Sequence, residues 1–234
     1  MKFLAKALSV AALAVLVSTS ASAQILLNEI RTDQTGSDTD EYVELAGPAG
    51  ASLAGYSIVV IGDGTGGCGV VEAAISLAAF SIQADGYFAL RYSAGVALLT
   101  GYDATLTGSF ENSDNLTFLL VTGNTAAVAN DLDTNNDGIL DTTPWATIVD
   151  QVGLSEGTVV NCTTDEYLYT TTVVGPDGTF APGHVYRCGA TWLIGPFGGV
   201  LPTGGVDTVG AANTSCPVPV APSTWSNIKA RISN

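Results

Sequence analysis

The sequence predicts an all-β fold, either a sandwich or a barrel. Its apolar residues, rich in Val, Ile, Leu, Tyr and Phe, come in short runs that Gly, Asp, Asn, Ser and Pro separate. Such runs are typical of many short strands joined by turns. The body of the chain shows neither a sustained helical period nor a repeat at solenoid spacing, so helical and solenoid architectures are not expected.

The predicted elements follow one another from residue 24 onward. Strands are expected at residues 25–30, 42–45, 57–61, 70–75, 87–91, 116–121, 147–152, 167–173, 184–187 and 191–194. Residues 122–146 form a connection long enough to be a functional insertion. Residues 217–234 contain a stiff Pro-rich linker and then a short C-terminal helix over residues 225–232, capped by Ser223 or Thr224.

The N-terminus is typical of a signal peptide. Lys2 and Lys6 supply a basic start, residues 7–17 are apolar, and the small residues ending at Ala23 form a cleavage site. We expect cleavage after Ala23 and a secreted, cell-surface or periplasmic protein, in which residues 24–216 form the domain. No second apolar run of ~20 residues follows, so membrane insertion is not expected.

The charge of the chain excludes some partners. Without Lys2 and Lys6, five basic residues face 22 acidic ones, which gives a net charge of −17. Nucleic-acid binding needs basic groups against the phosphates, so no nucleic-acid partner is expected. Because 47% of residues are hydrophobic and only 12% are charged, the chain has ample material for a folded core.

Four cysteines remain after cleavage, namely Cys68, Cys162, Cys188 and Cys216. An even number in an exported chain favours two disulfides, for which three connectivities exist. Their spacing does not fit a zinc site. We favour Cys188–Cys216 and Cys68–Cys162, with free structural thiols as the alternative.

The long connection contains a candidate calcium loop. Oxygen-bearing side chains recur at every second position and a glycine follows at 138; the expected ligands are Asp131, Asp133, Asn135, Asp137, the carbonyl of Ile139, and Asp141. Calcium takes six to eight oxygen ligands, and this alternation with a sharp turn can wrap them around one ion. A plain acidic surface turn is the alternative.

The loop differs from a helix-loop-helix calcium switch. Pro144 stands where a bidentate Glu is expected, and no amphipathic helix flanks the loop. The loop resembles the Asp-rich calcium loops of thrombospondin type 3 repeats and dockerins. Asp131 or Asp150 is a candidate for the missing carboxylate, and a structural ion is expected rather than a sensor.

Three motifs near the N-terminus carry a family resemblance. The runs at 26–30 (Leu-Leu-Asn-Glu-Ile), 40–45 (Asp-Glu-Tyr-Val-Glu-Leu) and 53–58 (Leu-Ala-Gly-Tyr-Ser-Ile) together resemble the lamin-tail domain in its bacterial exported form. Residues 207–213 resemble its closing segment, with Val209 where proline is expected. The resemblance implies an immunoglobulin-like antiparallel β-sandwich that serves as a binding or scaffold module.

Within this family, Glu29 and Glu44 are the characteristic acids. As neighbours they would share an ion or a backbone donor; the alternative is ordinary solvent-facing or hydrogen-bonded strand carboxylates. No catalytic residue is predicted, because His184 is the only histidine and no Gly-x-Ser-x-Gly motif accompanies it.

The sequence thus favours a non-catalytic, calcium-binding module for binding or assembly outside the cytoplasm. Its expected partner is an unidentified protein or glycan at the cell surface or in the extracellular matrix, or a second copy of the chain. One alternative is a calcium-dependent carbohydrate-binding module that uses Trp145 and Trp192, although each is more often a packing residue. Another is a secreted calcium-dependent hydrolase that uses Glu29 and Glu44.

Overall fold

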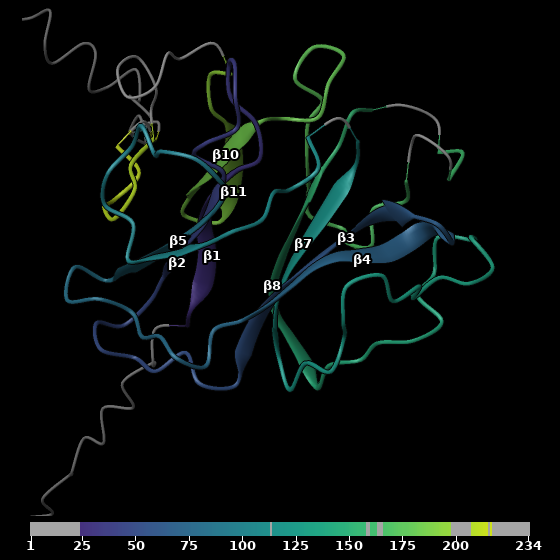
Figure 1. The fold of residues 1–234 in the computed structure, drawn as a ribbon, viewed down its shortest axis with the longest axis horizontal. Coiled ribbons are helices and arrows are strands. Elements are labelled where there is room, and N and C mark those ends of the chain that lie inside the picture. Colours follow the sequence, from purple (N-terminus) through teal and green to yellow (C-terminus); the bar gives the residue numbers. More distant parts are fainter. Residues whose placement is uncertain are drawn as a thin grey trace, which may run out of the picture.

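The computed structural model describes residues 24–112, 114–157, 160–162, 166–197, 207–214 and 216, which form two mixed β-sheets (Figure 1). The all-β prediction is confirmed for this part of the chain, which contains no helix. Accordingly, no helix suited to crossing a membrane occurs among these residues. The expected signal peptide at 1–23 and the C-terminal helix at 225–232 lie outside them.

The first sheet has the strand order β11-β10-β1-β2-β5-β6. Its strands are β1 (Leu26–Arg31), β2 (Tyr42–Ala46), β5 (Tyr87–Tyr92), β6 (Ala104–Leu106), β10 (His184–Cys188) and β11 (Thr191–Ile194). All neighbours are antiparallel except β5 and β6, which are parallel.

The second sheet has the order β4-β3-β7-β8-β9. Its strands are β3 (Tyr56–Gly64), β4 (Gly67–Ser76), β7 (Leu116–Thr122), β8 (Thr147–Leu154) and β9 (Val173–Val174). Only β8 and β9 run parallel. The antiparallel pairing expected from the resemblance is therefore found for every pair except these two, in each of which one short strand runs parallel to its neighbour.

Two strand assignments also differ from expectation. The strand expected at 167–173 is reduced to Val173–Val174, because the Tyr169 backbone N donates to the Thr117 side chain at 3.0 Å and pairing with β8 occurs only at Val173 and Val174. The short β6 was missed, since its three residues are partly or fully exposed and lack an apolar pattern.

One core lies between the inner faces of the two sheets. Val43 and Leu45 of the first sheet share a buried cluster with Ile58, Phe118 and Val152 of the second. Such contact between inner faces is the arrangement of a β-sandwich. The position between Val43 and Leu45 is the polar Glu44, which points to the other face as the alternation of a strand requires.

The outer face of the second sheet is also buried. Val59, Leu119 and Val121 form a second apolar cluster with Leu132 of the insertion, and the half-buried Trp145 packs against it. The long connection at 122–146 is therefore a cover over this sheet, which explains why β7 is buried along nearly its whole length.

Candidate functional site

The predicted calcium loop begins where the insertion pairs with the edge of β4. Ala129 N donates to Val71 O at 2.8 Å, Val71 N donates to Asn130 O at 2.9 Å, and Leu132 N donates to Gly69 O at 2.9 Å. These backbone hydrogen bonds fix the start of the loop at the edge of the sheet.

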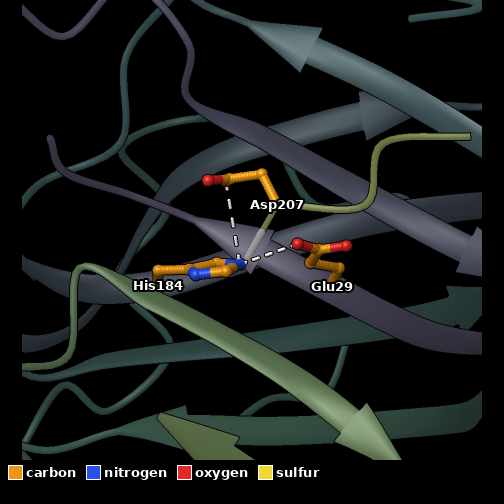
Figure 2. Close-up of side chains that lie close together, drawn as sticks. All are labelled: Glu29, His184 and Asp207. Carbon is orange, nitrogen blue, oxygen red and sulfur yellow. Dashed lines mark hydrogen bonds and ion pairs between the residues drawn. The ribbon is translucent and has the colours of Figure 1, made fainter. Parts of the chain in front are cut away.

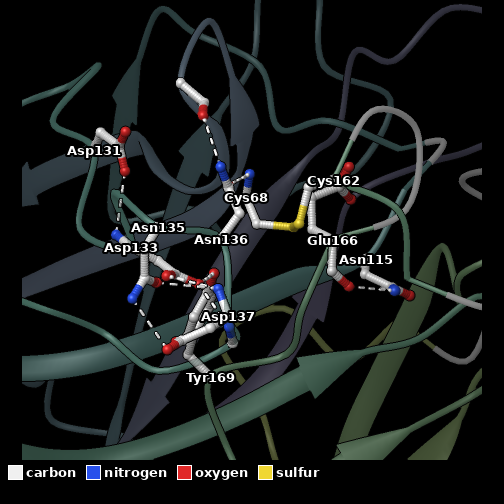
Figure 3. Close-up of a disulfide and its surroundings, with 12 residues drawn as sticks. Cys68, Asn115, Asp131, Asp133, Asn135, Asn136, Asp137, Cys162, Glu166 and Tyr169 are labelled. Atoms are coloured by element: carbon white, nitrogen blue, oxygen red, sulfur yellow. Dashed lines mark hydrogen bonds between the residues drawn. A yellow bond between two sulfur atoms is a disulfide. The ribbon is translucent and has the colours of Figure 1, made fainter.

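Asp133 is the centre of the loop and is completely buried (Figure 3). Its Oδ1 accepts a hydrogen bond from Asp137 N at 3.1 Å, and its Oδ2 accepts from Gly138 N at 2.9 Å and Tyr169 Oη at 2.7 Å. Asn135 Oδ1 accepts from the same Asp137 N at 3.2 Å. The side-chain oxygens of Asp133 and Asn135 therefore converge on one backbone amide.

The remaining predicted ligands are held by the backbone at the two ends of the loop. Asp131 Oδ1 accepts from Asp133 N at 3.1 Å, and Asp141 Oδ2 accepts from Thr134 N at 2.8 Å. Asp137 Oδ1 accepts from Ile139 N at 2.9 Å, and the Ile139 side chain is 71% exposed.

The structure thus brings Asp133, Asn135 and Asp137 together, with Asp131 and Asp141 at the ends. Carboxylate and amide oxygens are ligands that suit calcium. Across the described parts of the chain, however, the loop does not contain three acidic groups whose ligand atoms all lie within 4.8 Å of one another. Calcium binding by the loop stays a prediction.

Asn136 has a role that the sequence did not reveal. With φ at 55°, its side chain turns toward the β3–β4 hairpin, where Oδ1 accepts from Cys68 N at 2.8 Å and Nδ2 donates to Gly66 O at 3.3 Å. Asn is among the few residues that adopt this backbone conformation at low cost. This preference was the only feature of the sequence that could have indicated the role of Asn136. Asn136 therefore fastens the loop beside the Cys68–Cys162 disulfide (Figure 3).

Both favoured disulfides, Cys68–Cys162 and Cys188–Cys216, are confirmed. The first connects the β3–β4 hairpin to the segment after β8. The second connects the end of β10 to the C-terminal part of the described chain.

A buried polar cluster lies on the outer face of the first sheet (Figure 2). His184 Nε2 lies 2.7 Å from Glu29 Oε1 and 3.8 Å from Asp207 Oδ1, and Glu29 and His184 are completely buried. Glu29 also accepts hydrogen bonds from Tyr42 Oη and Thr208 Oγ1, each at 2.7 Å.

Glu44 lies directly opposite Glu29 across β1 and β2, so the expected neighbours are indeed adjacent. Its carboxylate accepts hydrogen bonds from Asn28 Nδ2 at 2.7 Å and Gly210 N at 2.6 Å. Burial raises the pKa of Glu44 to about 8, although these two hydrogen bonds act in the opposite direction. Both glutamates therefore bind donors from the 207–213 segment.

The same segment is fastened by a buried ion pair. Arg31, which is completely buried, donates from Nε and Nη2 to the two Asp207 oxygens, each at 2.7 Å. Burial alone would raise the pKa of Asp207, but the hydrogen bonds and charge of Arg31, together with His184, outweigh it and hold the pKa below its usual value. This ion pair and the hydrogen bonds to Glu29 and Glu44 hold residues 207–213 against β1, β2 and β10.

The two tryptophans considered for ligand binding lie in packed positions. Trp145 is half-buried against the outer-face cluster, while Trp192 is only 7% exposed and its ring lies 4.7 Å from the Arg187 guanidinium carbon. Asp150 pairs with Arg187 and accepts from Leu27 N at 2.9 Å, so its carboxylate is already bound outside the calcium loop.

An open depression lies next to the loop. It is lined by Gly138, Ile139, Leu140, Gln151, Leu168, Tyr169, Thr170 and Thr171. Gly138, at φ 84°, permits the turn at its rim, since a side chain there would press against the Tyr167 ring. Comparison of the chain with protein-family models, with curated proteins and with solved structures finds no match.

Proposed function

We propose that the chain is an exported, non-catalytic binding module in which calcium stabilises the 131–141 loop. The observation that carries the proposal is the convergence of Asp133 and Asn135 on the Asp137 amide. These three side chains would supply the central oxygen ligands, with the Ile139 carbonyl and Asp141 next along the loop.

The position of the loop supports a structural role for the ion. The insertion covers an apolar sheet face through Leu132 and is fixed by Asn136 and Tyr169. An ion bound there would stabilise the cover and would not be expected to move a helix, as a sensor does. The two disulfides are compatible with an extracellular or periplasmic location, where free calcium is abundant.

The surface beside the loop is the proposed contact face. The exposed Ile139 and Tyr169, whose hydroxyl donates to Asp133, both line the depression. Calcium binding would therefore fix the shape of this face, on which a protein or a glycan would dock.

We further propose an immunoglobulin-like sandwich of the lamin-tail type. Two of the family-like motifs form the paired strands β1 and β2. The closing segment lies against them, because Asn213 Nδ2 donates to Asn28 Oδ1 at 3.1 Å and Gly210 N donates to Glu44.

The Glu29–His184–Asp207 cluster supports this architecture and is not proposed as a catalytic centre. Glu29 and His184 are completely buried, and Glu29 already accepts from Tyr42 and Thr208. A general acid or base must reach its substrate, which these groups cannot do without unfolding the segment over them.

Thermal unfolding of residues 24–234 in millimolar calcium and in chelator tests the proposal. A bound ion stabilises by RT ln(1 + [L]/Kd), about 2.7 kcal/mol at a hundredfold excess over Kd. We expect calcium to raise the unfolding midpoint and Asp137→Ala to reduce that rise. Asp85→Asn is the matched control, because Asp85 is an exposed turn residue of equal charge. An equal rise in the Asp137→Ala variant would refute the loop as the site.

The docking face is tested separately by glycan-array binding in calcium and in chelator. We expect Ile139→Ser to remove any calcium-dependent binding without changing the thermal midpoint, since this side chain is exposed. Binding that persists unchanged in the variant would place the ligand elsewhere.

A further inference from the structure

A second group of acids lies at the end of the β3–β4 hairpin, in residues that the calcium loop does not include. Carboxylate oxygens of Asp63 on β3, Glu72 on β4 and Glu111 in the connection before β7 all lie within 4.8 Å of one another. Three segments of the chain thus bring their negative charges to one point.

Gly62 makes room for this arrangement. A side chain at Gly62 would overlap the Glu72 carboxylate, which lies over the glycine and beside the apolar Leu116. Glu72 Oε1 accepts a hydrogen bond from Asp63 N at 3.3 Å, so backbone and glycine together hold Glu72 in place.

A fourth carboxylate adjoins the group. Glu111 lies within hydrogen-bonding reach of both Glu72 and Asp114. The four groups therefore repel one another when ionised.

Glu166 supplies an independent observation. Its side chain is completely buried, and neither of its carboxylate oxygens has a hydrogen-bond partner. Glu166 lies beside the acidic group, because Asn115, which directly follows Asp114, donates a hydrogen bond to the Glu166 carbonyl. A buried carboxylate without a partner is costly unless something binds it.

The position of Glu166 is set by its surroundings. Asn115 Nδ2 donates to the Glu166 carbonyl at 2.8 Å (Figure 3), and the Asn115 Oδ1 accepts from Glu156 N at 2.7 Å. The Cys68–Cys162 disulfide fixes the chain just before Glu166. The carboxylate is thus held at this place by contacts that do not involve its own oxygens.

The arginines in the described residues do not neutralise the group. Arg31 binds Asp207, Arg187 binds Asp150, and Arg91 donates to backbone carbonyls such as that of Thr39. A cation from solution can bind these carboxylates and reduce their mutual repulsion.

We propose that Asp63, Glu72 and Glu111 bind a calcium ion, with Asp114 and Glu166 completing the site. All the ligand atoms would be carboxylate oxygens, which suit a hard cation such as calcium and not the nitrogen and sulfur preference of zinc. The site is separate from the 131–141 loop, and it stands whether or not that loop binds an ion.

Calorimetric titration of chelator-treated residues 24–234 with calcium tests the site. The Asp137→Ala variant removes the loop contribution, and Glu72→Gln/Glu111→Gln is added to it. We expect calcium affinity in the combined variant to fall by at least about tenfold relative to Asp137→Ala alone. Asp85→Asn in the same background should leave the affinity unchanged. Equal affinities with and without the two glutamine substitutions would overturn the proposal.

Stability provides a second measurement that a purely structural role would not reproduce. In chelator, Glu72→Gln/Glu111→Gln should unfold at a higher temperature than the wild type, because like-charge repulsion is relieved. In saturating calcium the order should reverse, because the variant lacks the bound ion. A variant that is more stable in both conditions would contradict the site. Loss of all binding in Asp137→Ala alone would refute this site while leaving the loop proposal intact.

Discussion

Asn136 lies between two proposed calcium ligands, yet its side chain points away from them to the β3–β4 hairpin. Replacing it with glycine keeps the left-handed backbone accessible and removes both hydrogen bonds. We expect Asn136→Gly to cost about 1–2 kcal/mol of unfolding free energy in chelator.

Comparison with Asn136→Ala separates the loss of the two hydrogen bonds from the cost of backbone strain. It removes the same hydrogen bonds and also places a Cβ at φ 55°, which adds about 1 kcal/mol of strain. Urea unfolding of both variants measures the difference. An alanine variant as stable as the glycine variant would mean that the loop relaxes out of this conformation.

Glu41 makes stability depend on pH. It is 1% exposed, and burial raises its pKa from 4.5 to about 8 even though its carboxylate accepts from Phe110 N. Because the folded state holds this proton more tightly, its stabilising effect is complete below about pH 4.5 and is lost as pH rises through about 8.

Glu41→Gln removes this effect. Because the pKa rises from 4.5 to about 8 on folding and one pKa unit corresponds to about 1.4 kcal/mol, the loss of stability in the wild type is on the order of 5 kcal/mol. We expect the variant to be more stable than the wild type at pH 9 and no more stable at pH 4. Chemical unfolding in chelator at both pH values checks this, with Asp85→Asn as control; parallel pH profiles would be the contrary result.

At the scale of elements, the 207–213 segment depends on the Arg31–Asp207 pair. Asp207→Ala leaves a completely buried guanidinium without its carboxylate, which should cost about 3–5 kcal/mol. The double variant Arg31→Met/Asp207→Leu removes both charges and should be less destabilised than Asp207→Ala. Urea unfolding of the three proteins completes the comparison. A double variant less stable than Asp207→Ala would show that the pair is not the main contact.

The strands with clear apolar character were predictable from sequence. In β2 the inward Val43 and Leu45 alternate with Tyr42 and Glu44, and β7 is mostly apolar because both its faces are covered. The short β6 and β9 were not predictable, since each depends on pairing with a distant neighbour and not on its own pattern.

The candidate sites also divide into one that was predictable from the sequence and one that was not. The alternation of oxygen ligands from Asp131 to Asp141 is local, so the sequence displays it directly. The approach of Glu72 and Glu111 to Asp63 is not local, because strand pairing and the connection before β7 bring them together. Nothing in their sequence neighbourhoods distinguishes these glutamates from the other acids.

For the whole molecule, the two disulfides should differ in effect. Cys68–Cys162 closes 94 residues and Cys188–Cys216 closes 28, so loop-closure entropy favours the former by about 1 kcal/mol. We expect Cys68→Ser/Cys162→Ser to lose more stability than Cys188→Ser/Cys216→Ser. Unfolding of both double variants in chelator gives the comparison, and the reverse order would mean that native contacts around Cys188 dominate.

The hydrogen bonds between the insertion and β4 also bear on solubility. β4 is an outermost strand, and an outermost strand offers unpaired backbone groups that can recruit a strand from another chain. Ala129, Asn130 and Leu132 occupy several of those groups at Gly69 and Val71. With these groups occupied, the edge of β4 is less available for pairing with another chain. Release of the insertion would expose the backbone groups of Gly69 and Val71 to pairing with a strand of another chain.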